Sequence, residues 1–327
     1  MTWRTPEESA LLVVQRRAMS DDFEVSFPRL DFPQGTEAAL DALDEVERIE
    51  QMLSVFRFDS RIQYVNLTAH DNPVRLDKEL FDLIALCVRI AEETDGAVDI
   101  TSGCLWKAWG FAKRQGRIPS AEELSHAKEH TGTQFLELDE VKRTIRFKKQ
   151  GIELNFGCVG KGFALDIAAG TLRGHGVDRF LFSGGLSSML ASGRDWKIGI
   201  AHPLRPGQRL RELVLNDVAV STSGSQKQFF RYAGRRYSHL IDPRTGQPAE
   251  GVFTATVLAP TATLAELLST AFFVLGAEKA AEYCSTHPEV SAVLTVPPEN
   301  VSDGTLENLK PLGGLCMVEF NHTGDIF

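Results

Sequence analysis

The sequence predicts an α+β fold that is built mainly from antiparallel sheets. Three observations lead to this class: short strand-like runs follow one another directly, amphipathic helices are interspersed among them, and strands and helices do not alternate regularly. Regular alternation would indicate a parallel sheet with helical crossovers. Since no repeat, low-complexity segment or linker divides the chain, we expect residues 19–327 to form a single domain after an N-terminal extension, residues 1–18.

The first elements follow from the spacing of apolar side chains. Residues 22–27 (DFEVSF) alternate like a strand, and two amphipathic helices follow, one beginning at Thr36 and one spanning 77–93. The second helix stops before Gly96, after which a strand is expected. The positions expected to face the core are Leu40, Leu43, Val46, Ile49 and Met52 in the first helix and Leu80, Leu83, Leu86 and Ile90 in the second.

The middle of the chain carries two local signatures. Ser120 and Glu123 have the spacing of a capping box, which opens a short third helix. Residues 135–149 have the pattern of a β-hairpin. A strand that begins at Ile152 is then expected to lead through the glycine loop 157–162 into another helix.

Short strands dominate the remainder of the chain. A helix from Thr263 to Gly276 interrupts them. The strands are expected within residues 180–190, 196–201, 212–216, 218–224, 235–241, 252–260, 290–296 and 315–320.

Composition restricts the classes of partner. The formal net charge of −9 argues against a nucleic-acid or anionic-membrane partner, since either would favour a basic face. No apolar run approaches the ~18 residues of a transmembrane helix, so no transmembrane segment is expected. Two glutamates precede the first apolar run, unlike a secretory signal, and we expect a cytoplasmic location. The five cysteines lack metal-ligand spacing, which predicts reduced thiols.

One histidine is not explained by turn chemistry. In SHLIDPRTGQP, residues 238–248, Asp242, Pro243 and Gly246 are typical turn residues. They do not account for His239, a titratable side chain at the end of the preceding strand. His239 is therefore a catalytic candidate, and a structural histidine that caps the turn is the alternative.

The loop GCVGKG, residues 157–162, places Lys161 at the start of a helix. Backbone N–H groups and a positive charge at this position suit a phosphate. The loop is neither a Walker A loop nor a GxGxxG fingerprint. From these residues alone, a tightly packed turn explains the glycines at least as well.

Two oxygen-bearing side chains share one side of the helix that starts at Thr263. Glu266 and Thr270 are four residues apart, and their oxygens suit a hard cation such as Mg²⁺. The alternative is a capping box between Thr263 and Glu266, in which the glutamate only closes the first helical turn. Spacing alone favours this alternative.

Three further segments place hydroxyl, carboxylate or glycine groups at the ends of elements. They are TDGAVDITSG (94–103), SGGLSS (183–188) and STSGSQKQFF (221–230). Taken singly, each is explained by loop chemistry or core packing.

Taken together and in this order, the motifs resemble those of one family, the ApbE-type FAD:protein FMN transferases. The resemblance runs from about Met19 to about Gly276. The strings that carry it are AMSDDFEV, SVFRFDSRIQYVN, TDGAVDITSGCLWKAWGF, LNFGCVGKGFALD, VSTSG, YSHLIDPRTGQP and AELLSTAFFVLG. The resemblance implies an α+β fold around a central flavin cleft.

The family binds FAD and, with Mg²⁺, moves its FMN half onto a threonine hydroxyl of an acceptor flavoprotein, releasing AMP. The resemblance therefore implies FAD as substrate, Mg²⁺ as cofactor and such an acceptor as partner. It implies that His239 acts near the pyrophosphate, as a general base or by stabilising charge. The implied cofactor contacts are Met19, Phe56, Ala97, Val98, Asp99, Asn155, Lys161 and Leu240. The implied metal ligands are the carbonyl oxygen of Cys158 and the side chains of Glu266 and Thr270.

The chain departs from the family pattern at several positions. Asn155 and Glu266 stand where the family usually has aspartate, and Phe56 where it usually has tyrosine. Two alternative functions therefore stay open: an FAD pyrophosphatase that releases free FMN and AMP, and a flavin-binding protein without catalysis. Family members are also often exported or membrane-anchored, unlike the location expected here.

Overall fold

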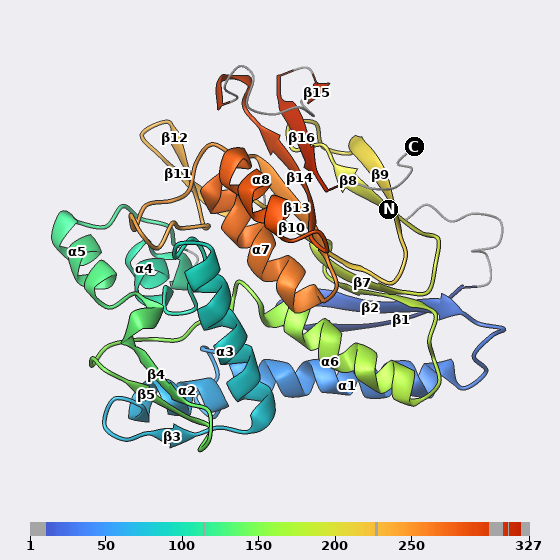
Figure 1. The fold of residues 1–327 in the computed structure, drawn as a ribbon, viewed down its shortest axis with the longest axis horizontal. Helices are drawn as coiled ribbons and strands as arrows, with labels where there is room; N and C mark the ends of the chain where they lie inside the picture. Colours follow the sequence, from blue (N-terminus) through green and yellow to red (C-terminus); the bar gives the residue numbers. More distant parts are fainter. Residues whose placement is uncertain (1–10, 114, 226–227, 301–309, 313, 322–327) are drawn as a thin grey trace.

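A computed structural model of the chain describes residues 11–113, 115–225, 228–300, 310–312 and 314–321. It confirms the predicted α+β class with mainly antiparallel sheets. The largest sheet has nine strands, and all neighbouring strands in it pair antiparallel (Figure 1). Across the sheet the strands are β1 (Leu11–Ala18), β2 (Asp21–Pro28), β6 (Phe180–Gly184), β7 (Ser188–Ser192), β10 (Ala219–Gly224), β13 (Thr254–Ala259), β14 (Ser291–Val296), β16 (Cys316–Phe320) and β15 (Lys310–Pro311).

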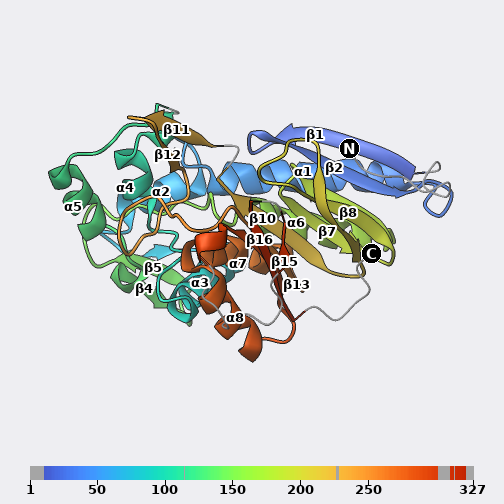
Figure 2. The ribbon, with the colours of Figure 1, turned by 90° about the horizontal axis from the view of Figure 1, so that it is seen from above.

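Three long helices cover one face of this sheet together with the shorter helix α8 (Ala277–Thr286), and a hairpin covers the other face (Figures 1 and 2). The long helices are α1 (Gly35–Leu53), α6 (Gly160–Gly174) and α7 (Ala262–Leu275), and the hairpin is β8 (Trp196–Ala201) with β9 (Arg209–Leu215). Strand β6 shows the division, because Phe180 and Phe182 belong to the helix-side core whereas Leu181 packs with Trp196 of the hairpin. Because both of its faces are buried, the sheet forms the central layer of the fold, between the helices and the hairpin.

A second group of elements lies beside one end of these helices (Figure 1). Its helices are α2 (Arg61–Thr68), α3 (Lys78–Glu93), α4 (Gly103–Ala108), η2 (Phe111–Lys113), α5 (Ala121–Glu129) and η3 (Thr133–Phe135), and its sheet contains β3 (Val74–Arg75), β5 (Thr144–Phe147) and β4 (Leu136–Asp139). The other elements are the hairpin β11 (Phe229–Tyr232)–β12 (Arg235–Ser238), helix α8 (Ala277–Thr286) and η4 (Pro298–Asn300).

Two local predictions in this group are confirmed. The hairpin expected over 135–149 is β4–β5. The capping box of α5 is present, because Ser120 Oγ accepts from Glu123 N at 3.1 Å and Ser120 N donates to the Glu123 carboxylate at 2.8 Å. Both signatures depend only on neighbouring residues, which is why the sequence alone predicts them.

Strand β1 pairs with β2 along its whole length, from Leu11 opposite Pro28 to Ala18 opposite Asp21. The predicted N-terminal extension, residues 1–18, therefore contains an edge strand of the main sheet, and residues 1–10 lie outside the described residues. Among the described residues, no helix has both the length and the apolar character needed to cross a bilayer.

Helix α1 buries four of the five positions predicted to face the core, namely Leu43, Val46, Ile49 and Met52. Leu40 is 44% exposed, which contradicts its expected burial, whereas Ala39, Leu43 and Val46 are buried. Alanines form much of the buried stripe, and the helix lies against α6 (Figure 1). The expectation fails at Leu40 because alanine side chains, and not this leucine, form the contact between α1 and the neighbouring core.

Residues 152–156 and 97–100 do not form the strands predicted for them. The two segments instead lie side by side, since the backbone N–H of Asn155 donates to the carbonyl of Ile100 at 2.7 Å. The side-chain amide of Asn66 donates to Leu154 O at 3.1 Å and accepts from Leu154 N at 2.9 Å. A side chain thus satisfies backbone groups that a neighbouring strand would otherwise satisfy.

Candidate active site

Contacts link three segments that are far apart in the sequence and that are predicted to share one cleft. The segments contain Gly96, Lys161 and His239. The backbone hydrogen bond from Asn155 N to Ile100 O joins the first two segments. A Cβ placed on Gly96 would lie 3.6 Å from the Arg244 side chain, which follows His239 in the third segment. The positive charge of Lys161 also lowers the pKa of His239, so the second and third segments lie within electrostatic reach of each other.

The N-terminal ends of α6 and α7 are packed closely together. A Cβ on Gly162 would lie 2.2 Å from the carbonyl oxygen of Ala262. One turn further along α6, the Asp166 carboxylate accepts from the backbone N–H groups of Ala262 and Thr263, both at 2.8 Å. Asp166 therefore caps α7 from a neighbouring helix, and burial raises the pKa of this carboxyl.

Replacing Gly162 by alanine is expected to lower the free energy of unfolding by about 1–3 kcal/mol, because the new methyl group meets a backbone oxygen. Gly170→Ala is the matched control on the same helix. Nothing lies within 4 Å of its Cβ, so this variant should be neutral or more stable by about 0.5–1 kcal/mol. Urea unfolding of both variants measures the difference, and equal stabilities would contradict the close packing.

Helix α7 begins before Thr263, which removes the basis of the predicted capping box. The N-cap is Thr261, whose hydroxyl accepts from Leu264 N at 3.2 Å. Thr263 donates its hydroxyl to Asp166 instead. Glu266 therefore does not close the first turn of its helix, and the capping alternative is wrong.

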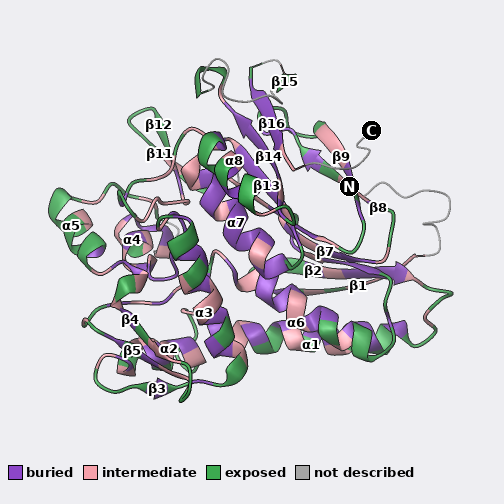
Figure 3. Ribbon diagram, viewed as in Figure 1, coloured by how far each residue is buried: buried purple, intermediate pink, exposed green. Residues whose placement is uncertain are grey.

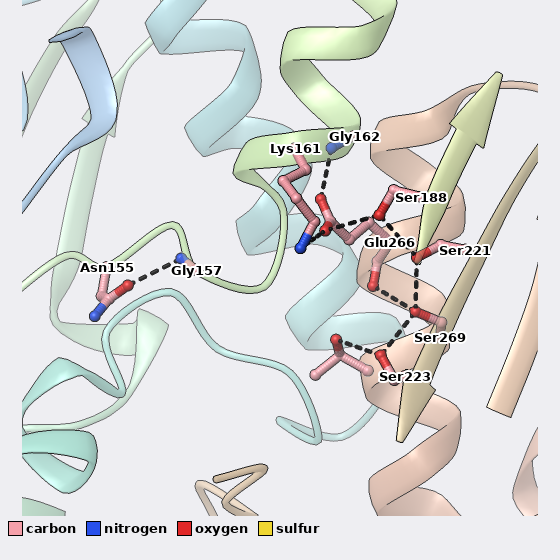
Figure 4. Close-up of polar contacts among 10 residues, drawn as sticks. Asn155, Gly157, Lys161, Gly162, Ser188, Ser221, Ser223, Glu266 and Ser269 are labelled. Carbon is pink, nitrogen blue, oxygen red and sulfur yellow. Dashed lines mark hydrogen bonds and ion pairs between the residues drawn. The ribbon is translucent and has the colours of Figure 1, made fainter. Parts of the chain in front are cut away.

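The Glu266 carboxylate contacts the start of α6 (Figure 4). The residue is only 5% exposed. One oxygen accepts from Gly162 N at 2.6 Å, and the other lies 3.2 Å from Ser188 Oγ and 3.5 Å from Lys161 Nζ. A buried carboxylate at this position therefore fixes the lysine at the end of the glycine loop.

A chain of hydroxyl groups links Glu266 to Thr270 on the next turn of α7 (Figure 4). It runs from Ser188 to Ser221 (3.4 Å), on to Ser269 (3.3 Å), to Ser223 (2.9 Å) and to Thr270 (3.2 Å). Hydroxyl groups can each donate and accept, so this chain can reorient when a ligand binds to one end of it.

The donors around Glu266 and Thr270 have the chemistry that a hard cation requires. Mg²⁺ is commonly held by one or two carboxylates together with waters and substrate phosphates. The described residues contain no group of three or more His, Cys, Asp or Glu side chains that could share a metal. Burial, followed by the charges of Glu266 and Asp99, raises the pKa of Cys158 to about 12, so its carbonyl rather than a thiolate suits Mg²⁺.

One ring nitrogen of His239 is occupied by the protein. Its Nδ1 lies 2.9 Å from the carbonyl oxygen of Gln228, which can only accept, so Nδ1 carries a proton. Burial lowers the pKa of His239 below its ordinary value of 6.5, the positive charge of Lys161 lowers it further, and the bond to Gln228 opposes both. The imidazole is therefore neutral at pH 7, and Nε2 carries the free lone pair.

Aromatic side chains hold the segment that carries His239. The Phe111 ring lies 6.4 Å from the His239 ring, and Phe230 of β11 stacks on Tyr237 of β12 at 5.1 Å. Both Phe230 and Tyr237 contact Trp109, whose Nε1 donates to Gly246 O at 2.8 Å in the turn after His239. This cluster connects α4 to both sides of the histidine.

The segment 97–99, predicted to contact the cofactor, is largely buried. Ala97 and Val98 belong to the hydrophobic core. The Asp99 carboxylate accepts from Thr101 N at 2.7 Å and Thr133 N at 3.0 Å, and burial raises its pKa. In this structure the side chain of Asp99 thus shapes the loop around it.

Four other predicted contacts lie nearer the surface. Phe56 is 72% exposed, with its ring 6.1 Å from Trp106 in an edge-to-face arrangement. Met19 is in the β1–β2 turn with φ +50°, and Leu240 packs partly buried against the core. The Asn155 side chain accepts from Gly157 N at 2.9 Å and so shapes the glycine loop (Figure 4).

The sequence analysis did not single out Asn66 or Asp166 as parts of the site, although both had a signal in the sequence. Asparagine in the interior of a helix and aspartate within the apolar start of α6 are both locally unfavourable, which indicates a tertiary role.

The chain matches the ApbE family model over residues 19–294. It is 32% identical over 280 residues to the FAD:protein FMN transferase of Escherichia coli (strain K12), which covers 83% of this chain and 80% of the relative. The ApbE protein of Thermotoga maritima superposes with a TM-score of 0.80 at 28% identity, over 87% of this chain and 94% of that one. The apo form of the flavinyl transferase ApbE of Pseudomonas stutzeri gives a TM-score of 0.79 at 27% identity, over 96% and 98% of the two chains. The chain belongs to the ApbE family.

Proposed function

We propose that this chain is an FAD:protein FMN transferase that moves the FMN half of FAD onto a threonine hydroxyl of an acceptor flavoprotein and releases AMP. The observation that carries the proposal is the neutral His239, whose Nε2 has no hydrogen-bond partner among the described residues and whose pKa is lowered by the nearby charge of Lys161. The relatives named FAD:protein FMN transferase support it.

His239 supplies the base in this proposal. Its Nε2 accepts the threonine proton while the hydroxyl oxygen bonds to the phosphorus of the FMN phosphate. The bond from that phosphorus to the bridging oxygen breaks, and AMP leaves with the oxygen and its electron pair. Lys161 neutralises phosphate charge, and Glu266 positions the lysine at 3.5 Å.

Mg²⁺ is proposed to be held by Glu266, Thr270 and the carbonyl oxygen of Cys158. The hydroxyl chain and the single buried carboxylate fit a metal that takes its remaining ligands from water and phosphate. When bound, Mg²⁺ supplies charge neutralisation to the pyrophosphate. Of the eight implied cofactor contacts, Phe56 offers an exposed ring for stacking and Met19, Asn155, Lys161 and Leu240 are partly exposed, whereas Ala97, Val98 and Asp99 are buried.

Incubation with FAD and Mg²⁺ tests the proposal directly. The acceptor is a flavoprotein that the Escherichia coli relative flavinylates in a parallel reaction. We expect a flavin-bearing acceptor by mass spectrometry together with one AMP for each flavin transferred. Free FMN with an unmodified acceptor would instead establish a pyrophosphatase, and intact bound FAD would establish a flavin-binding protein without catalysis.

A further inference from the structure

The hairpin β11–β12 forms a separate two-stranded sheet beside the site (Figure 1). Its turn, Ala233-Gly234, has positive φ at both residues, which matches the right-handed twist of a tight hairpin. One face packs on α4 through Phe230 and Tyr237. Because side chains alternate along a strand, the other face carries Phe229, Arg231 and, opposite Arg231, Arg236.

Two arginines lie directly opposite each other on this outer face. Arg231 pairs with Arg236 in the hairpin register, and both residues are exposed. Like charges in such a pair destabilise a sheet. Desolvation, and then the charge of Arg231, lower the pKa of Arg236. The Arg231–Arg236 pair therefore does not stabilise the hairpin, and folding alone does not explain its presence.

Neither arginine has an acidic partner within the described part of the chain. Arg236 lies over the Phe229 ring at 3.9 Å and donates to the carbonyl of Ser225. The third arginine of the hairpin, Arg235, does pair with Glu250 at 2.6 Å. The basic face is unusual on a chain whose net charge is −9. Charge complementarity thus points to an acidic ligand.

The same face offers aromatic surface and a position close to the reaction. Phe229 is 40% exposed, and most of the hairpin is exposed (Figure 3). His239 follows Arg236 by three residues, a separation of roughly 10 Å along an extended strand. When the target hydroxyl of an acceptor protein lies at His239, acceptor residues only a few positions away from that hydroxyl can therefore reach Arg231 and Arg236.

We propose that the outer face of the β11–β12 hairpin, formed by Phe229, Arg231 and Arg236, docks an acidic, extended segment of the acceptor protein next to its target threonine. This inference rests on the proposed function. It assigns acceptor selection to a surface that is separate from the groups that handle FAD and the metal.

Binding of labelled peptides to the FAD-loaded protein tests the inference. The probes are threonine peptides of one length, flanked by aspartates, by asparagines or by lysines. We expect the aspartate peptide to bind the parent, and the double variant R231Q/R236Q to bind it about 10-fold more weakly, with less dependence on salt. R231E/R236E should reverse the preference and select the lysine peptide.

The matched control is R75Q/R146Q, which removes two exposed arginines from the three-stranded sheet β3–β5–β4 and should leave peptide binding unchanged. FAD affinity is measured on every variant by flavin fluorescence. Equal binding of the aspartate and asparagine peptides by a protein that binds FAD would overturn the docking inference, as would tighter binding of a single-stranded oligonucleotide. Failure of the parent to bind FAD would reject the proposed function instead.

Discussion

Replacing His239 by alanine is expected to lower the rate of FMN transfer by about 10²–10⁴-fold while FAD still binds. The imidazole lies within electrostatic reach of Lys161, and its Nε2 has no hydrogen-bond partner among the described residues. The Nδ1 bond to Gln228 is lost as well, but it is a single bond at the edge of the hairpin, so the melting temperature should change little. Transfer rate, FAD affinity and melting temperature are measured on one preparation.

The pH profile separates a catalytic histidine from a structural one. Because burial lowers the pKa of His239 below 6.5, the neutral form is already dominant at pH 7. The transfer rate of the parent should rise with pH through that lowered pKa and reach its plateau at a lower pH than a histidine with the ordinary pKa would give. Protonation of this residue also opposes folding, so its contribution to stability is present above 6.5 and is lost as pH falls through the lowered pKa.

His126→Ala is the control for this prediction, since His126 is an exposed histidine on α5. It should retain both the parental rate and the parental pH profile. A His239→Ala protein that transfers FMN at the parental rate would remove His239 from the mechanism. A variant that instead loses melting temperature together with FAD binding would identify a structural histidine that caps the turn.

The features that the sequence predicts correctly are those that depend on neighbouring residues. The capping box of Ser120 and the hairpin over 135–149 are determined within a few positions, and both are present. The family resemblance predicts which distant segments come together in the fold, and the periodicity of apolar residues cannot predict this. The helix-forming pattern of α1 is also correct except at Leu40, where the partner helix decides which stripe is buried.

The features that the sequence does not predict depend on distant partners. The segment at Leu154 has the pattern of a strand, yet the amide of Asn66 takes the place of a neighbouring strand. Glu266 has the spacing of a capping residue, and only the fold shows that its carboxylate reaches Gly162, 104 positions away in the sequence. The same limitation applies to Asp166, which caps a helix that begins 96 positions later.

Glu266→Gln is expected to weaken Mg²⁺ binding by about 10- to 100-fold, the range seen even for residues that only support a metal ligand. The amide carbonyl of glutamine still accepts from Gly162 N, so the melting temperature should change little. Binding is measured with Mn²⁺ as a spectroscopic probe and with Mg²⁺ as its competitor. This readout does not depend on turnover.

Glu266→Asp should give the opposite pattern. Aspartate keeps the charge but withdraws the carboxylate by about one carbon–carbon bond, roughly 1.5 Å, from Gly162 N. The lost hydrogen bond should lower the free energy of unfolding by about 1–3 kcal/mol, because a buried N–H is left without a partner. Metal affinity should stay within a few-fold of the parent, since Thr270 and the Cys158 carbonyl are unchanged. If glutamine and aspartate affect Mn²⁺ binding equally, charge at position 266 does not hold the metal, and Glu266 only joins α6 to α7.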